Sequence, residues 1–230
     1  SSQLLNIVQF PASLNVVKLS TMAKGLTRAV IVDAALDLLD ESGIDALTLR
    51  ALASRLGVQA PALYWHVHNK QELLDEMGTE IHRRVLSRIV VLPAADWRPT
   101  LAGYARALRA EYLAHRDGAR TFSGTRLTDA AVLRAQEPWL RSWTDAGRPL
   151  ADAVDAAQVV TAFVVGFVIE EQERTPDRYS LADRDAALGA DVPLVTESGR
   201  AMFVDPETRF TTQLDMVLDG VGVRLSAHTS

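Results

Sequence analysis

From residue 26 onward, apolar residues recur at intervals of three and four, which is the spacing of one face of an α-helix. The first such run contains Ile31, Ala35 and Leu38, and Gly43 follows it. Glycine commonly ends a helix because it adopts the left-handed conformation that closes the last turn. The pattern therefore predicts a first helix that ends at Gly43.

Two short helices and one long helix are predicted next. Thr48 can cap a short helix that Gly57 ends, and a third short helix covers about residues 60–67. Asn69 then caps a longer helix that continues to about Val91. Three closely spaced helices at the N-terminal end are therefore expected to lead into a long one.

The remaining chain is also predicted to be helical. An apolar stripe from Leu101 to Tyr112 closes near Gly118. Residues 176–204 are rich in Pro, Gly, Asp and Ser and predict a long, partly ordered loop. No segment alternates apolar and polar residues between turn signals, so the predicted fold class is all-α. Further helices are expected at about residues 128–146, 150–175 and 205–224.

Charge and cysteine content narrow the functional classes. The formal net charge is −5, yet residues 1–32 hold Lys18, Lys24 and Arg28 without any acidic residue. Such a local basic region suits contact with phosphate groups whatever the net charge. The chain has no cysteine, which excludes disulfides, thiolate metal sites and thiol nucleophiles and fits a reducing cytoplasm. No run of about 18 uncharged apolar residues is present, so we expect no membrane span.

Residues 1–21 differ in composition from the rest of the chain, and Met22 opens a stretch typical of a natural start. We interpret the preceding residues as an extension, and no basic region precedes their apolar part as it would in a secretory signal. Lys18 and Lys24 could make this extension an arm that contacts DNA or protein. The alternative, which we favour, is an apolar tail that packs where it can.

Residues 48–70 have the pattern of a helix-turn-helix unit. Gly57 permits the tight turn between two short helices. The second helix is expected to present small residues outward, together with the adjacent aromatic residues Tyr64 and Trp65. Exposed aromatic side chains favour contact with a partner, and a helix of this size fits the major groove of DNA. The residues expected to form its small core are Leu52, Ala53, Leu56, Val58 and Leu63.

This segment resembles the DNA-reading unit of TetR-family repressors, on the Gly57-Val58 turn, the run LYWH at 63–66 and the Asn69-Lys70 helix start. The resemblance covers about residues 26–175 and the last helix. It implies an extension or arm over 1–25, a three-helix helix-turn-helix DNA-binding domain over 26–72, and a helical ligand-binding and dimerisation domain over 73–226. Other segments that fit the family are LLDE at 73–76, HRDGAR at 115–120, GTR at 124–126 and GFVIEEQE at 166–173.

The resemblance implies DNA contacts at specific positions. Ala60 and Ala62 replace polar residues found in the family, so the operator sequence is expected to differ. Trp65 could instead pack in the core, and Lys70 could be a solvated charge, whereas contact is the better interpretation for Arg50. The implied groove or base contacts are Arg50, Gln59, Ala60, Pro61, Ala62 and Tyr64, and the implied phosphate contacts are Trp65, His66 and Lys70.

The resemblance also implies a ligand pocket in the C-terminal domain. In drug-binding members a histidine holds Mg²⁺, but the three polar anchors of that site fall here on Leu86, Tyr104 and Phe122. Glu170 alone makes a poor octahedral site, so we expect no metal and no cofactor. The expected ligand is a bulky, flat, hydrophobic molecule such as an antibiotic. The predicted pocket residues are Leu86, Tyr104, Leu108, Phe122, Thr125, Arg126, Trp139, Trp143 and Glu170, although they could simply fill the core, and for Leu108 core packing is favoured.

Two late helices, at about 150–175 and 205–224, are implied to form a four-helix bundle between two subunits. Arg116, Asp117 and Arg126 are candidates for relaying a ligand-induced change, although a helix that ends at Gly118 with Arg116 exposed is the simpler interpretation. Residues expected on the dimer helices are Val159, Ala162, Phe163 and Gly166 and Phe210, Leu214, Val217 and Val221.

The sequence therefore predicts a cytoplasmic homodimeric repressor that binds a palindromic operator and is released by a small hydrophobic inducer. An activator, or a regulator controlled by a protein partner, is the alternative. An enzyme is not expected, because the chain has no Gly-rich phosphate loop or nucleophile elbow, and Glu170 and Glu171 point to different sides of a helix. The histidines share no metal-ligand spacing, and they are His66, His68, His82, His115 and His228.

Overall fold

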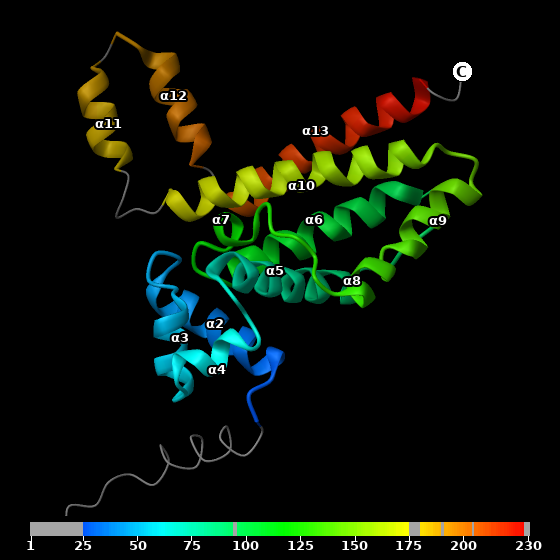
Figure 1. The fold of residues 1–230 in the computed structure, drawn as a ribbon. Coiled ribbons are helices and arrows are strands. Elements are labelled where there is room, and N and C mark those ends of the chain that lie inside the picture. The colour runs from blue at the N-terminus through cyan, green and yellow to red at the C-terminus, as the bar shows by residue number, and fades with distance from the viewer. Residues whose placement is uncertain (1–24, 94–95, 175–179, 190, 204, 228–230) are drawn as a thin grey trace, which may run out of the picture.

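The computed structural model describes residues 25–93, 96–174, 180–189, 191–203 and 205–227, and the regular elements in these ranges are all helices (Figure 1). The all-α prediction is confirmed. The N-terminal part consists of α2 (Arg28–Ser42), α3 (Leu49–Leu56) and α4 (Ala60–Tyr64), followed by α5 (Lys70–Ser87). The C-terminal part contains α6 (Trp97–Leu113), α7 (Gly118–Phe122), α8 (Ala130–Arg134), α9 (Glu137–Asp145), α10 (Leu150–Glu173), α11 (Leu181–Leu188), α12 (Pro193–Met202) and α13 (Pro206–Ala227).

The helix ends of the N-terminal part follow local sequence signals. The Thr48 hydroxyl accepts a hydrogen bond from the Ala51 N–H at 3.1 Å, and Asn69 caps α5 in the same way. Gly57 ends α3 in the left-handed region, at φ 68°. Helix α4 is shorter than predicted and ends at Tyr64, and α5 ends at Ser87 instead of about Val91.

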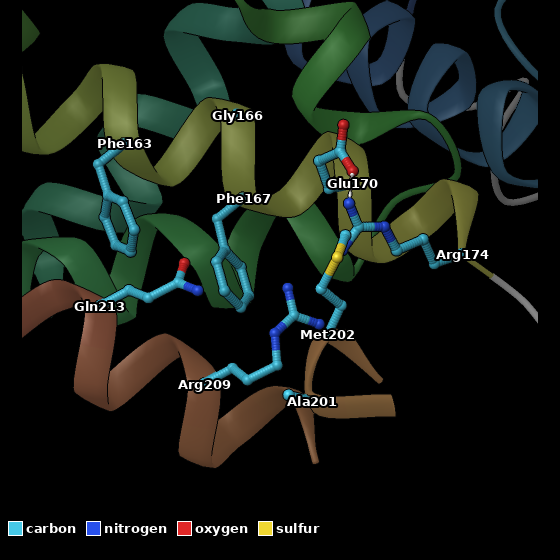
Figure 2. Close-up of a pocket in the computed structure, with 9 residues that line it drawn as sticks. All are labelled: Phe163, Gly166, Phe167, Glu170, Arg174, Ala201, Met202, Arg209 and Gln213. Carbon is cyan, nitrogen blue, oxygen red and sulfur yellow. Dashed lines mark ion pairs between the residues drawn. The ribbon is translucent and has the colours of Figure 1, made fainter. Parts of the chain in front are cut away.

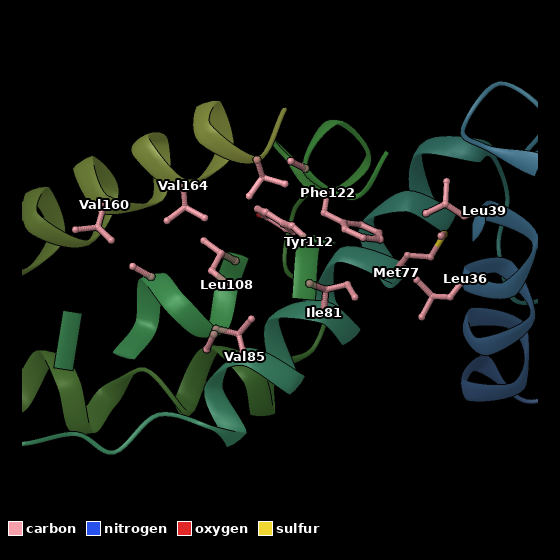
Figure 3. Packing of buried hydrophobic residues seen from close by; sticks show 14 of the residues in the cluster. Leu36, Leu39, Met77, Ile81, Val85, Leu108, Tyr112, Phe122, Val160 and Val164 are labelled. Atoms are coloured by element: carbon pink, nitrogen blue, oxygen red, sulfur yellow. The ribbon is translucent and has the colours of Figure 1, made fainter. Parts of the chain in front are cut away.

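Helix α5 joins the two parts of the molecule through one continuous core. Its residues Met77 and Ile81 are buried beside Leu39 of α2, and further along the same helix Val85 lies near Leu108 of α6 (Figure 3). The predicted domain boundary at residues 72 and 73 therefore falls inside a single helix. A displacement of the C-terminal half of α5 is thus expected to reach the N-terminal part.

Three expectations about the C-terminal part are wrong. The loop expected over 176–204 contains the helices α11 and α12, which pack on each other and project away from the body (Figure 1). Pro193 occupies the first turn of α12, where proline is compatible with a helix. The helix expected at 128–146 is divided into α8 and α9. Gly118 does not end α6 but begins α7.

Helix α10 is the one helix of the described ranges that is long and apolar enough to cross a membrane by length and composition. The expectation that no run of about 18 uncharged apolar residues is present still holds, because Asp155 and Glu170 bound the uncharged part of this helix. In the structure, α10 packs along one side against α6, α7, α9 and α13. This packing explains its apolar residues Val160, Val164 and Val168, which are all buried.

Replacing Gly118 with alanine is expected to lower the free energy of unfolding by about 1–3 kcal/mol, the usual cost of overpacking. A Cβ at this position would overlap the backbone carbonyl oxygen of Tyr112, which cannot rotate away. Urea unfolding followed by circular dichroism measures the change. The matched control is Gly103→Ala on α6, where a Cβ meets nothing within 4 Å. Equal stability of the two variants would contradict the close contact at Gly118.

Candidate DNA-reading surface and ligand pocket

Helix α4 presents aromatic side chains to solvent. Leu63 and Val67 are buried and α4 packs against α3, whereas Tyr64 is 49% exposed and Trp65 is 87% exposed. The structure therefore excludes core packing of Trp65 within one chain. Gln59 and Pro61 are exposed beside them, Ala60, Ala62 and His66 are half-buried, and this surface contains every predicted contact of the reading helix.

The basic residues near α4 differ in their partners. Arg55 of α3 forms ion pairs with Glu41 at 2.6 Å and with Asp37 at 3.4 Å, so its charge is largely neutralised. Arg50, on the same helix, is exposed and forms no ion pair with any residue the structure describes. Arg50 is thus the cation on α3 that remains available to a phosphate or a base.

Lys70 is not a freely solvated charge. Its Nζ donates a hydrogen bond to the backbone carbonyl of Ile44 at 2.7 Å and so ties the start of α5 to the α2–α3 connection. The side chain stays exposed at the first turn of the helix. The suggested arm residues Lys18 and Lys24 lie outside the described residues.

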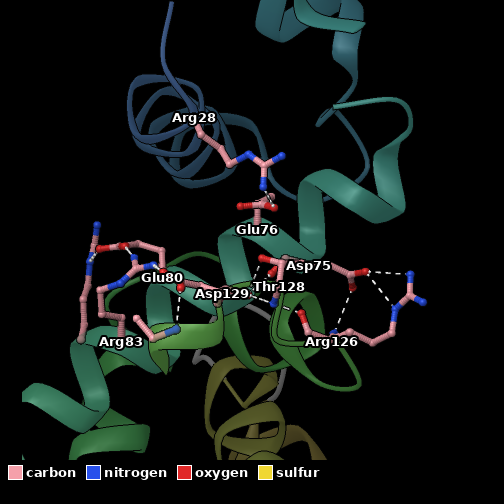
Figure 4. Close-up of polar contacts among 11 residues, drawn as sticks. Arg28, Asp75, Glu76, Glu80, Arg83, Arg126, Thr128 and Asp129 are labelled. Atoms are coloured by element: carbon pink, nitrogen blue, oxygen red, sulfur yellow. Dashed lines mark hydrogen bonds and ion pairs between the residues drawn. The ribbon is translucent and has the colours of Figure 1, made fainter. Parts of the chain in front are cut away.

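A first clamp joins α5 to the loop that follows α7 (Figure 4). The buried carboxylate of Asp75 accepts hydrogen bonds from the Arg126 backbone N–H at 3.0 Å and from its guanidinium at 3.2 Å. Burial alone would raise the pKa of Asp75, but these hydrogen bonds and one from Gln71 outweigh burial and lower it. Thr79 accepts a further hydrogen bond from the Thr128 N–H at 2.9 Å. The loop is therefore held directly on the helix that carries the reading unit.

A second clamp joins the turn before α7 to the end of α2. The His115 ring lies 3.0 Å from the Asp40 carboxylate, and the Arg116 backbone N–H donates to the same group at 3.0 Å. Arg116 is exposed, yet its guanidinium also donates to the carbonyl of Glu41 at 3.3 Å. The HRDGAR segment is thus a contact between the two parts of the molecule and not merely a helix end.

A cavity of about 280 Å³ lies between the C-terminal half of α5, the start of α6, and α9. Three of the predicted pocket residues line it: Leu86, Tyr104 and Trp139. The hydroxyl groups of Tyr104 and Thr161 are 2.8 Å apart. Sequence reasoning did not predict the other lining residues, which are His82, Ile89, Val91, Thr100, Leu101, Ala135, Gln136, Pro138 and Ala157.

The other predicted pocket residues lie elsewhere. Leu108, Phe122 and Trp143 are buried in the core, where the ring of Phe122 stacks on Tyr112 with centroids 6.2 Å apart. Phe122, one of the three positions at which the resemblance places a polar anchor, is thus part of the core. Thr125 lies against Gly78 of α5, and the Arg126 side chain is 81% exposed at the first clamp.

Glu170 lies on a different surface, in a groove between α10, α12 and α13 (Figure 2). It pairs there with Arg174, while the Arg209 guanidinium lies beside Phe167 and Met202. Within the described ranges, no group of three or more His, Asp or Glu side chains could hold a metal ion. The residues present therefore do not fit the magnesium site that the resemblance implies.

Two family models match the chain and divide it as the structure does. The model described as bacterial regulatory proteins of the tetR family matches residues 31–77, and that of the tetracyclin repressor-like C-terminal domain matches residues 91–225. This protein belongs to the TetR family. It is therefore a transcriptional regulator with a helix-turn-helix DNA-binding domain and a ligand-binding C-terminal domain.

Individual TetR-family proteins support this assignment. The tetracycline repressor protein class D of Escherichia coli is 40% identical over 206 residues, which are 88% of this chain and 92% of that protein. A TetR variant of Acinetobacter baumannii AYE in complex with minocycline is 33% identical with a TM-score of 0.68, covering 87% of this chain and 95% of that one. ActR of Streptomyces coelicolor in complex with actinorhodin is 27% identical with a TM-score of 0.72, covering 87% and 98%.

The TetR-family chain also exposes an apolar groove along α10 and α13. Val159 is 51% exposed and Met216 is 67% exposed on neighbouring faces of these helices. Gly220 of α13 lines this groove, whereas Gly166 of α10 lines the separate groove that contains Glu170, and a Cβ at either glycine would meet nothing within 4 Å. Both positions on these two helices therefore have room for side chains from outside the chain.

Proposed function

We propose that this protein is a cytoplasmic repressor that binds a palindromic operator as a homodimer and releases it when a hydrophobic small molecule fills the cavity beside α5. The observation that carries the proposal is the shared helix. His82, Leu86 and the following Ile89 line the cavity from α5 and its end, and the N-terminal half of α5 packs against α2. A molecule in the cavity therefore acts directly on the element that supports the reading unit.

Dimerisation supplies the second reading unit. A helix-turn-helix dimer contacts two half-sites about one helical turn apart, roughly 34–36 Å. The apolar groove along α10 and α13 supports a bundle with a second copy, because exposed apolar surface of this extent favours a partner. Gly166 and Gly220 allow the partner's helices to approach closely. The second copy then contributes to DNA affinity through linked binding.

The two clamps supply a route for induction. A ligand that enters between α5, α6 and α9 pushes these helices apart and changes the tilt of α5. The Asp75–Arg126 clamp and the His115–Asp40 clamp transmit the movement to the loop after α7 and to α2. The two reading units then lose the spacing that fits consecutive turns of DNA.

The kind of ligand follows from the cavity walls and the relatives. Its lining is mainly apolar, with a few polar groups, as in most small-molecule sites. The similar A. baumannii and S. coelicolor proteins bind minocycline and actinorhodin, respectively. We therefore place this protein's inducer among flat, antibiotic-like hydrophobic molecules that bind without a magnesium ion.

Measuring inducer affinity with and without saturating operator tests the proposal. Screening hydrophobic antibiotics for release of the protein from its own promoter DNA identifies the inducer. Linkage requires operator to weaken inducer binding by the same factor by which inducer weakens operator binding. A nearly complete switch needs about 5.5 kcal/mol of differential affinity, roughly a 10,000-fold change. Equal affinity in the two states would show that the ligand does not drive release.

A further inference from the structure

Three polar side chains that line the cavity beside α5 have no hydrogen-bond partner among the residues the structure describes. They are the Trp139 indole N–H on α9, which is buried, and two half-buried groups, the His82 ring on α5 and the Gln136 amide just before α9. Buried polar groups are normally paired, since an unpaired one loses its bonds to water without compensation. Unpaired groups on α5 and at the start of α9, on two sides of one cavity, point to a ligand that supplies the missing partners.

The cavity contains no charged side chain. Its lining includes no Asp, Glu, Lys or Arg, and the two titratable residues in it are His82 and Tyr104. Burial lowers the pKa of His82, and burial raises the pKa of Tyr104 despite its hydrogen bond with Thr161, so both are neutral at pH 7. An ionic ligand would lose its hydration there and gain no opposite charge.

Size and wall chemistry restrict the ligand further. At about 280 Å³ the cavity lies near the lower end of small-molecule pockets, which span roughly 300–1,000 Å³. Leu86, Ile89 and Trp139 offer apolar and aromatic surfaces on different sides. Such walls favour a flat aromatic ring system of modest size.

We propose that the cavity selects an uncharged aromatic molecule with hydrogen-bonding groups, and that His82 is a specificity-determining residue that binds one of these groups. The inference rests on the proposed function only in treating this cavity as the inducer site. Because His82 lies on α5, one side chain then both selects the ligand and connects it to the helix that supports the reading unit. His82 lies one turn before Leu86, the position that the family resemblance did indicate.

Two fluorescent probes with the same ring system test the selection. N-phenyl-1-naphthylamine is uncharged, and 8-anilinonaphthalene-1-sulfonate adds a sulfonate to the same arylamine skeleton. Both become brighter in apolar surroundings, so titration of the full-length protein at pH 7 gives both affinities. We expect the uncharged probe to bind at least ~10-fold more tightly, because the sulfonate loses its hydration without gaining a cationic partner.

Variants at the cavity separate charge from size. His82→Leu is expected to weaken the uncharged probe by roughly 3- to 10-fold, the effect of one hydrogen bond, and His82→Gln should restore most of the loss. Leu86→Lys should raise the affinity for the sulfonate probe and reverse the preference. The control His68→Leu alters an exposed histidine that pairs with Glu72, outside the cavity, and should leave both affinities unchanged. Variants are compared only when their helical circular dichroism equals that of the unmodified protein.

The inference is overturned if the uncharged probe fails to bind, if both probes bind equally, or if His82→Leu leaves binding unchanged. Operator binding of the unmodified protein, measured separately without probe, tests the proposed function. If the protein does not bind its promoter DNA but still discriminates between the probes, the proposed function is contradicted, whereas the inferred selectivity of the cavity is supported.

Discussion

Replacing Gly166 with arginine is expected to prevent dimerisation and to lower operator affinity by roughly 100-fold or more. Linked binding of two reading units contributes about 100- to 10,000-fold over one unit, and this contribution disappears in a monomer. Gly166 lies on α10, one of the two helices that we assign to the subunit interface, so an arginine there would keep the partner's helices at a distance. The added side chain meets nothing within 4 Å of its Cβ in one chain, so the monomer should still fold. Analytical ultracentrifugation and operator titration measure the two effects.

Gly103→Arg is the matched control for this substitution. Gly103 is also a helical glycine whose Cβ would meet nothing within 4 Å, but it lies on α6, away from the groove. The control should remain dimeric and bind operator with unchanged affinity. Gly220→Arg, on α13, should reproduce the Gly166→Arg result. If the Gly166→Arg protein sediments as a dimer, the surface formed by α10 and α13 is not the subunit interface.

Replacing Arg50 with alanine is expected to weaken operator binding by roughly 5- to 150-fold, the usual loss of about 1–3 kcal/mol for one specific base contact. The exposed Arg50 guanidinium has no ion-pair partner among the described residues, so its full charge is available to DNA. Base preference should relax at the contacted position. Fluorescence anisotropy with operator variants measures both changes.

Arg55→Ala removes the same charge from the same helix and is the comparison. Arg55 is already paired with Glu41 and Asp37, and its hydrogen bond from the guanidinium to Glu41 raises its pKa and lowers that of Glu41. Its removal should change operator affinity by less than about threefold, since exposed ion pairs contribute little. Equal losses at Arg50 and Arg55 would indicate a diffuse charge effect instead of a specific contact.

The helix-turn-helix unit was predictable because its signals are local. Thr48 and Asn69 cap helices, and Gly57 ends one, through hydrogen bonds and backbone angles within a few residues. The pattern of small and aromatic residues on α4 likewise indicated an exposed face. The paired helices α11 and α12 were missed because Pro, Gly and Asp also begin and end short helices, so composition does not distinguish them from a loop.

The pocket was only partly predictable because a cavity depends on packing between segments that are distant in the chain. The resemblance indicated Leu86, Tyr104 and Trp139, which line it. It also indicated Phe122 and Trp143, whose rings fill the core instead. His82 could have been included among the predicted pocket residues because it lies one turn before Leu86 on the same face of the helix.

The sequence by itself determined the helical fold, the reading unit and the family, because periodicity, caps and motif spacing are properties of neighbouring residues. The tertiary structure alone decided where the cavity lies, which arginine is neutralised and how Asp75 and Asp40 hold the two parts together. The two clamps depend on side chains 51 and 75 residues apart, Asp75 with Arg126 and Asp40 with His115, and the Arg55 ion pairs depend on residues of a different helix. These side chains come into contact only when α5, α6 and the loop after α7 pack together. The local sequence pattern does not show which distant residues will become neighbours.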